Sequence, residues 1–301
     1  MSQFRLLLGL AAAAFACAVS AQSSAFCLTH TCDFKKENCE IVDGCNVSGK
    51  TLFWASSVVT WDVQKDDSLK RGITSVELEE VATRAFTQWQ NVDCPGGGHP
   101  SISLLDKGPI ACGKAEYNQA QPNANVITFH DGTWPYGADS AIETLALTTV
   151  FFNGETGEIY DANVEVNTNQ ADFALVNPHY PAVNLNAVLT HELGHFLGLS
   201  HSSNGDATMF SSYMAGMDTL EADDVAAICA SLPPGRSTKN TSAPRHGFSG
   251  ECCTGDCSGV TSGCCATAVG GNVPASNVLG LWAFGLGLCA WGARARFKRR
   301  E

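Results

Sequence analysis

Residues 191–201 read H-E-L-G-H-F-L-G-L-S-H, and they decide how the rest of the chain is interpreted. On a helix, His191 and His195 lie one turn apart on the same face, so both imidazoles can bind one ion. Gly198 tolerates the positive φ angle that ends a helix, which lets the chain turn back and add His201 as a third ligand. Three imidazoles with one open position are typical of a catalytic zinc ion, whereas a structural zinc ion usually has four protein ligands.

Glu192 follows the first histidine and can reach a water molecule on the ion without binding the ion itself. A zinc ion in such a site lowers the pKa of its bound water toward about 7. Glu192 is then placed to take the proton and later to deliver it to the leaving amine. The pattern therefore predicts hydrolysis of a peptide bond, with Glu192 as the general base.

This stretch, together with Met209, resembles the metzincin zinc proteases, and residues 188–232 resemble their matrixin branch. The resemblance implies that Met209 lies beneath the zinc ion as an apolar floor. It also implies that the segment after the methionine lines the pocket for the first residue beyond the scissile bond. This chain has Tyr213 in that segment but Ser211 in place of the family's proline, so we expect the shape of the pocket to differ.

The patterning on both sides of this stretch predicts an α+β domain, with one twisted, mixed, five-stranded sheet and three helices. The strands are expected at residues 51–63, 101–105, 125–129, 146–152 and 159–167. The helices are expected at residues 75–92, from residue 185 through the two histidines, and at residues 220–232. Ser75 and Asn184 are the expected N-caps of the first two helices.

Residues 146–152 stand where matrixins have the edge strand above the cleft. The resemblance implies that substrate pairs with this strand as an added antiparallel strand and contacts Ala146, Leu147 and Thr148. The last strand carries Asp161 and Glu165, which could bind calcium. Exposed acids on a strand are more often simply solvated, and this is the favoured alternative.

Fourteen cysteines favour an oxidising compartment over the cytosol. Residues 1–21 resemble a secretory signal peptide, and residues 22–50 form a Cys-rich N-terminal segment. We expect one disulfide between Cys94 and Cys112, which flank a Gly/Pro-rich stretch, whereas the other pairings cannot be deduced. Two less favoured alternatives use the early cysteines, either to hold a second zinc ion or to cap the catalytic one: Cys27, Cys32, Cys39 and Cys45.

The catalytic domain is expected at residues 51–233, followed by a linker with a late cysteine cluster at residues 234–273. The apolar run at residues 278–293 is short for a membrane-spanning helix, but residues 274–277 can extend it, so the helix is expected at residues 274–293. The basic segment at residues 294–301 fits cytoplasmic retention by the positive-inside rule. Together, the late cysteine cluster, the short apolar stretch and the Arg-rich end resemble the C-terminal sorting signals of myxobacterial surface proteins. We therefore expect a bacterial protein that is secreted or anchored in the membrane, with its catalytic domain outside the cytoplasm.

A net charge of −12 argues against nucleic acid as a partner. We expect a monomer that acts on protein or peptide substrates, uses Zn²⁺ and could also bind Ca²⁺. The chain departs from the family in having no cysteine switch, no His/Asp set for a second zinc ion and no hemopexin-like repeat. Two alternatives stay open. One is an adhesion protein that keeps the zinc scaffold without turnover, against which Glu192 argues, and the other is a hydrolase of non-peptide amides.

Overall fold

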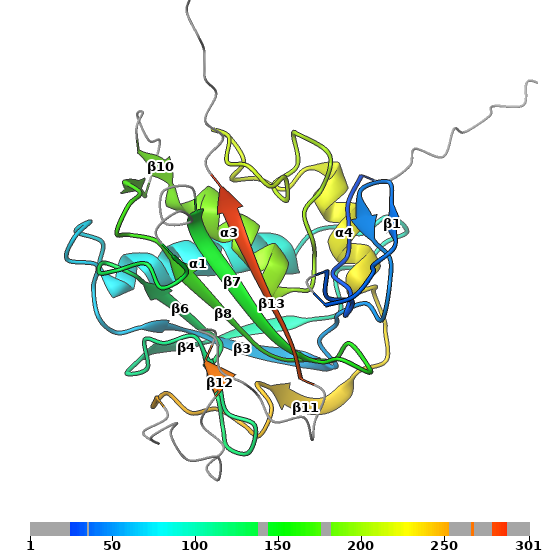
Figure 1. The fold of residues 1–301 in the computed structure, drawn as a ribbon, viewed down its shortest axis with the longest axis horizontal. Coiled ribbons are helices and arrows are strands. Elements are labelled where there is room, and N and C mark those ends of the chain that lie inside the picture. Colours follow the sequence, from blue (N-terminus) through cyan, green and yellow to red (C-terminus); the bar gives the residue numbers. More distant parts are fainter. Residues whose placement is uncertain are drawn as a thin grey trace, which may run out of the picture.

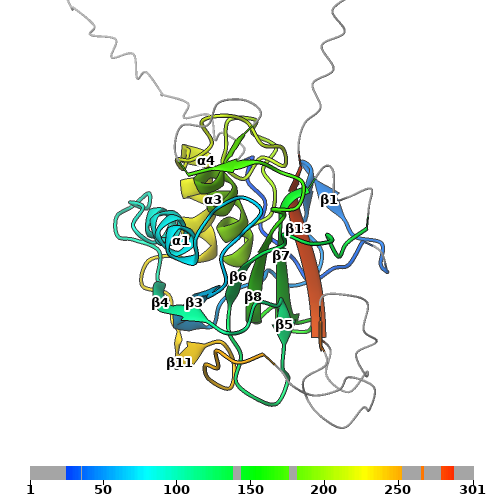
Figure 2. The same cartoon turned by 90° about the vertical axis from the view of Figure 1, so that its left-hand side faces the viewer.

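The computed structural model describes residues 25–34, 36–137, 144–175, 182–252, 266–267 and 279–287. Within these residues, three helices lie on one side of a mixed seven-stranded sheet (Figures 1 and 2). Four strands run parallel: β3 (Ser56–Gln64), β4 (Ser103–Ile110), β6 (Val126–Phe129) and β8 (Ile159–Val166). The fifth expected strand, β7 (Thr144–Asn153), is antiparallel to β8, so the predicted α+β fold is confirmed.

Two further strands extend this sheet. β11 (Lys239–Ala243) pairs parallel with β3, and β13 (Leu279–Gly287) pairs antiparallel with β7. The order across the sheet is β11-β3-β6-β8-β7-β13, and β4 also pairs with β3. Short strands form three separate pairs: β1 (Ile41–Val42) with β2 (Cys45–Asn46), β9 (Phe173–Ala174) with β10 (Val183–Asn184), and β5 (Glu116–Tyr117) with β12 (Ala266–Thr267).

Helix α1 (Ser75–Gln90) begins one residue earlier than its expected cap implies, because Thr74 and not Ser75 is the N-cap. The Oγ1 of Thr74 accepts the backbone N–H of Glu77 at 3.2 Å, and the Glu77 carboxylate accepts the Thr74 N–H at 2.8 Å. This reciprocal pair satisfies two backbone donors that a helix start leaves open. The expected cap Asn184 is confirmed for α3 (Leu185–Phe196), since its side chain accepts the Asn186 N–H at 2.9 Å.

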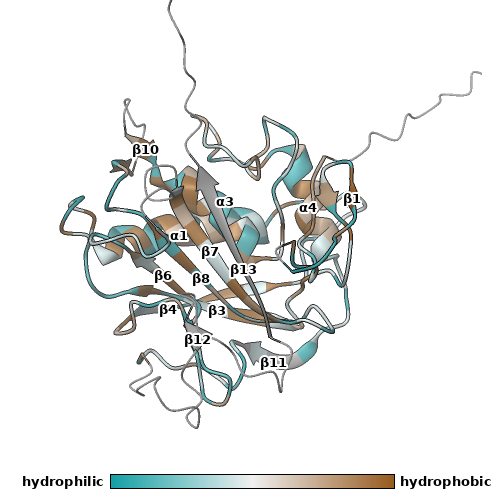
Figure 3. Cartoon of the chain, in the orientation of Figure 1, coloured by the Kyte–Doolittle hydropathy of each residue, from teal (hydrophilic) through white to brown (hydrophobic). Residues whose placement is uncertain are grey.

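Helix α3 is held between the sheet and α1 by the main apolar core, to which the hydrophobic strands contribute (Figure 3). Two buried tryptophans also fasten α3 through its backbone. The indole N–H of Trp89 donates to the carbonyl of Thr190, and that of Trp54 donates to the carbonyl of Phe196, both at 2.8 Å. The third helix, α4 (Ala222–Ser231), contributes Ala227 and Ile228 to the same core. The backbone of α3 is therefore held at its middle and at its C-terminal end.

The disulfides differ from the expected pairing. Cys94 is bonded to Cys229 and Cys112 to Cys252, so the predicted Cys94–Cys112 bridge is wrong. The eight residues of β4 lie between Cys94 and Cys112. At about 3.3 Å per residue this strand separates its two ends by roughly 26 Å, far beyond the reach of a disulfide.

The early cysteines are also paired, Cys27 with Cys45 and Cys32 with Cys39. A thiolate is the form that binds zinc, and a sulfur in a disulfide is not a thiolate. A second zinc ion on this cluster, and a cysteine cap on the catalytic centre, are therefore both excluded in this structure.

The segment after α4 is packed on the domain and is not the free linker that its composition predicts. The Arg236 guanidinium donates to the carbonyl oxygens of Trp54 at 2.7 Å and Ser56 at 3.1 Å. β11 then pairs with β3, and Cys252 is bonded to the body. The backbone makes most of these contacts, so apolar periodicity could not reveal them.

Residues 279–287 form strand β13, so the helix expected at residues 274–293 is wrong for this segment. Its glycines at positions 280, 285 and 287 disfavour a helix, while the outer side of β7 offers backbone groups to an added strand. The rest of the expected helix lies outside the described residues. Among those that are described, no helix combines the length and apolar character needed to cross a membrane.

The acids of β8 are buried, contrary to the favoured expectation that they are solvated. Asp161 is fully buried, and Glu165 accepts from His130 Nε2 at 2.6 Å and from the Tyr136 hydroxyl. The helix-free face of the sheet is thus partly covered, in part by strand β5, whose Tyr117 stacks on Phe151. Alternation along a strand indicates which residues share a face, but not whether a distant loop covers that face.

Asp62, on β3, gives a testable dependence of stability on pH. Burial, together with the neighbouring Asp106, raises the pKa of Asp62 to about 8. The folded chain therefore keeps a proton that the unfolded chain releases above about pH 4, and the free energy of unfolding should fall as pH rises from about 4 to 8. We expect Asp62→Asn to remove part of this fall, as measured by urea unfolding at pH 5 and pH 8. The exposed Asp66→Asn is the matched control, and equal pH slopes for the parent and Asp62→Asn would contradict the expectation.

Candidate metal centre

Three histidines come together at the C-terminal end of α3. His191 and His195 are buried on one face of the helix, and Gly198 then takes a φ of +93° that turns the chain. A Cβ at position 198 would lie 3.0 Å from the carbonyl oxygen of Leu52, so glycine suits this turn sterically as well. His201 returns to the first two rings, and one possible ligand atom from each histidine lies within 4.8 Å of the others.

Backbone carbonyls set the tautomers of the two helical histidines. The Nδ1–H of His191 donates to Thr208 O at 2.6 Å, and the Nδ1–H of His195 donates to Leu199 O at 2.9 Å. Because a carbonyl oxygen can only accept, these nitrogens carry the protons and the Nε2 lone pairs are left for the centre. The two Nε2 atoms are 3.1 Å apart. The buried Nε2 of His201 has no hydrogen-bond partner among the described residues.

Burial keeps all three rings neutral. It lowers the pKa of His191 to about 3 and that of His201 to about 4, and it holds the pKa of His195 well below its usual value. Two lone pairs 3.1 Å apart repel each other unless a cation lies between them. In a tetrahedral zinc site, bonds of about 2.1 Å place neighbouring nitrogens about 3.4 Å apart. The donor set and its spacing therefore fit a zinc ion.

Glu192 lies between His191 and His195 in the sequence, and its side chain is fully buried. A contact with strand β7 of the sheet holds it in place. The hydroxyl of Thr148, on β7, donates to Glu192 Oε2 at 2.5 Å and also contacts the Glu192 carbonyl oxygen at 3.0 Å. This contact fixes the orientation of a carboxylate that is adjacent in sequence to His191. A carboxylate so placed can accept a proton from a group bound at the centre.

Met209 lies under the same stretch of α3. A Cβ added at Gly194 would overlap its Sδ and would also lie 3.0 Å from Cζ2 of Trp89. The Met209 carbonyl accepts the Ser202 N–H at 2.8 Å, which ties the methionine loop to the residue after His201. Met209 is thus a buried apolar contact on the helix that carries the first two histidines.

A matrixin family model matches residues 53–231, which include the histidine cluster, Glu192 and Met209. The chain belongs to the matrixin family. This matrixin is 29% identical over 179 residues to the metalloendoproteinase 1-MMP of Arabidopsis thaliana. The alignment covers 58% of this chain but only 43% of that relative, so the chain spans less than half of its length. The name of that relative describes a metalloendoproteinase.

Sequence reasoning missed two residues that support the centre of this matrixin. The buried Asp224 carboxylate of α4 accepts the backbone N–H groups of Thr208 at 2.8 Å and Met209 at 3.0 Å. Thr208 in turn provides the carbonyl that orients His191. Burial raises the pKa of Asp224, although these N–H groups act in the opposite direction. The only signal in the sequence was an acid in the first turn of the helix after Met209.

The residues expected to contact substrate lie near the centre, but β7 is not the edge of the sheet. β13 pairs with it, and Ala146, Leu147 and Thr148 are opposite residues 286, 285 and 284. The expectation that β7 is an edge strand is therefore wrong for the described chain. The hydroxyl of Tyr213 accepts the Asn184 N–H at 3.1 Å, and its ring packs against the small apolar cluster that contains Ala146.

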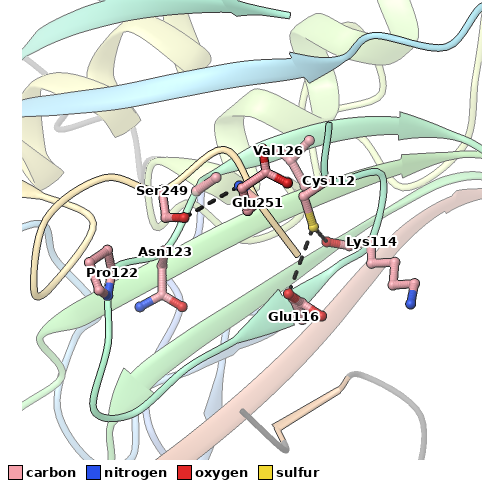
Figure 4. A pocket seen from close by; sticks show the side chains of 9 residues that line it. Cys112, Lys114, Glu116, Pro122, Asn123, Val126, Ser249 and Glu251 are labelled. Carbon is pink, nitrogen blue, oxygen red and sulfur yellow. Dashed lines mark hydrogen bonds between the residues drawn. The ribbon is translucent and has the colours of Figure 1, made fainter. Parts of the chain in front are cut away.

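A second group of potential ligands lies at a pocket that is lined by residues between Cys112 and Val126 and by Ser249 and Glu251 (Figure 4). It consists of Cys112, Glu116 and Cys252. The two sulfurs form a disulfide, and Glu116 Oε1 lies 3.7 Å from the Cys112 sulfur. Because neither sulfur is a thiolate, this group is not a zinc site.

Proposed function

We propose that this matrixin is a zinc-dependent endopeptidase that hydrolyses extended protein substrates. The observation that carries the proposal is a cluster of three neutral histidines beside one buried carboxylate, with two Nε2 lone pairs turned toward each other. His191, His195 and His201 would hold the zinc ion, which supplies a Lewis acid and activates water.

The residues of the chain then divide the remaining work. Glu192 accepts the proton of the attacking water and returns it to the leaving amine, so no covalent intermediate is needed. Thr148 holds the carboxylate in place from β7, and Thr208 and Leu199 hold the tautomers of two histidines. Met209 fills the space under α3, and Tyr213 belongs to the pocket beyond the scissile bond.

We also propose that the acids of β8 bind a calcium ion. Asp161 Oδ2 is buried without a hydrogen-bond partner among the described residues, and burial raises the pKa of Asp161 well above its usual value. A cation beside this oxygen would favour the charged carboxylate. Both oxygens of Glu165, in contrast, contact His130 and Tyr136. Asp161 is therefore the better supported of the two proposed ligands.

We also infer that the protein works outside the cytoplasm as a monomer, with no nucleic-acid partner. Four disulfides are compatible with an extracellular location. The resemblance of the late cysteine cluster, the apolar run and the basic tail (residues 234–301) to myxobacterial sorting signals supports a bacterial surface protein. We further propose a signal peptide at residues 1–21, a catalytic domain at residues 51–233 and a basic cytoplasmic tail at residues 294–301; the first and last of these lie outside the described residues.

Zinc removal tests the proposed function. We expect casein hydrolysis to stop with a chelator and to return with one equivalent of zinc, while Glu192→Ala binds zinc without hydrolysis. The assay uses both the intact chain and the chain cut before β13, which is described below. If zinc binds but neither form cleaves casein above the Glu192→Ala background, a non-catalytic adhesion protein is the better assignment. Cleavage of simple N-acyl amides without cleavage of casein would instead indicate a non-peptide amidase.

A further inference from the structure

Strand β13 covers the outer side of β7 along almost its whole length (Figures 1 and 2). The antiparallel register runs from residue 279 opposite Asn153 to residue 287 opposite Thr144, with one irregularity near its end. Among the strands that the structure describes, β13 is the last on this side of the sheet. The chain thus adds one of its own segments to the strand with which an extended substrate was expected to pair.

The register brings β13 level with the metal centre. Residue 284 is opposite Thr148, whose hydroxyl contacts the Glu192 carboxylate. β13 also comes close to α3, the helix that carries His191 and His195. Its backbone therefore passes the proposed general base in the antiparallel direction, which is also the direction expected for an added peptide.

Two strands cannot pair with the same side of β7 at once. The backbone N–H and carbonyl groups on one side of a strand form their hydrogen bonds with a single neighbouring strand. A tethered segment competes at an effective concentration set by its linker, which reaches the millimolar range for short flexible linkers. An intermolecular substrate at a lower concentration is therefore at a disadvantage.

We propose that β13 is an internal inhibitor that occupies the substrate strand position, and that extended proteins bind only after it leaves. The inhibition rests on the proposed peptidase function, whereas the pairing itself does not. Three of the nine residues in β13 are glycines, which weaken a strand because they have no side chain to pack. This composition suits a segment that must be displaced.

Cutting the chain after it has folded tests the proposal. A recognition sequence for a specific protease is inserted between Gly270 and Gly271, and the full chain is folded, cut and separated from the released fragment. We expect kcat/KM for an extended peptide to rise at least about tenfold, because the competing strand is no longer tethered. Hydrogen exchange at the outward amides of β7 should become faster. A synthetic peptide of residues 276–290 should restore both the inhibition and the slow exchange.

Proline substitutions provide a second test in the uncut chain, with a matched control. Proline lacks the N–H of a strand hydrogen bond and is disfavoured within a paired strand. We expect the combined Ala283→Pro and Phe284→Pro variant to raise kcat/KM and β7 exchange, because one of two adjacent residues must face β7 with its N–H. Ser276→Pro, placed before β13, should change neither quantity.

Two readouts separate failure of the inhibition from failure of the peptidase assignment. Unchanged β7 exchange after cutting would overturn the proposed pairing. Faster exchange in an active enzyme whose kcat/KM stays constant would overturn inhibition. If exchange becomes faster but neither form cleaves any peptide, the proposed function fails while the occupation of β7 by β13 stands.

Discussion

Replacing Glu192 with glutamine is expected to lower kcat for peptide hydrolysis by about 10²–10⁴-fold, the usual contribution of general acid–base catalysis. Glutamine has nearly the same size as glutamate and can still accept the hydroxyl of Thr148 through its amide oxygen, so α3 should keep its place. The amide cannot take up the proton of the attacking water. The loss should therefore appear in kcat, while zinc content and the midpoint of urea unfolding stay close to those of the parent.

Glu155→Gln is the matched control, because it makes the same chemical change at an exposed position in the turn after β7. It should leave all three quantities unchanged. Both variants are best assayed in the cut form, in which β13 cannot mask the chemical step. A Glu192→Gln enzyme that binds zinc and cleaves at the parental rate would show that another group moves the proton.

Replacing Gly194 with alanine is expected to destabilise the fold by about 1–3 kcal/mol, the usual cost of overpacking a core. Alanine is normally favoured over glycine inside a helix by about 1 kcal/mol. A loss of stability at position 194 would therefore indicate steric overlap and not helix propensity. Here the new Cβ would overlap Met209 Sδ and press on Trp89, and both side chains are buried. Displacing Met209 would also move the loop whose Thr208 carbonyl orients His191. Zinc affinity should therefore fall together with stability.

A double variant distinguishes this steric cause from a general defect in the helix. Met209→Ala alone removes a buried side chain and should cost about 2–5 kcal/mol. Combined with Gly194→Ala, it removes the atom that the new methyl group would overlap, so the double variant should be more stable than the sum of the single effects predicts. Gly205→Ala, where a Cβ has nothing within 4 Å, is the control. Strictly additive effects would mean that Met209 does not limit the space at position 194.

Local spacing predicted the parts of the site that lie close together in the chain. His191, Glu192 and His195 share one helix, and Gly198 and His201 follow within six residues of it. The Asn184 cap and the five strands of the catalytic region also follow from local rules. Such features depend on backbone geometry over one or two turns, which is the range in which side-chain periodicity carries information.

The missed features depend on contacts between distant residues. Asp224 supports the methionine loop from another helix, and the partners of Cys94 and Cys112 are 135 and 140 residues away in the sequence. The acids of β8 appeared solvated because alternation does not show which loop covers a face. The apolar pattern of residues 279–287 suits a helix and a strand equally, and the decision came from the open side of β7. Tertiary contacts resolve such ambiguities, and a single sequence does not contain them explicitly.

The bridge between Cys112 and Cys252 determines how far the enzyme could travel from a surface to which residues beyond Gly287 are attached. While β13 is paired, such an attachment leaves the domain from the end of β13 opposite Thr144 and holds the β7 side of the sheet close to its support. Once β13 is released, the last disulfide within the described part of the chain is the one at Cys252, which packs against the small cluster that contains Val126. When the two-residue pairing of β12 with β5 opens as well, about 35 residues become spacer, with a maximal extension of roughly 120 Å. Activation would in that case also enlarge the volume that one anchored molecule can search.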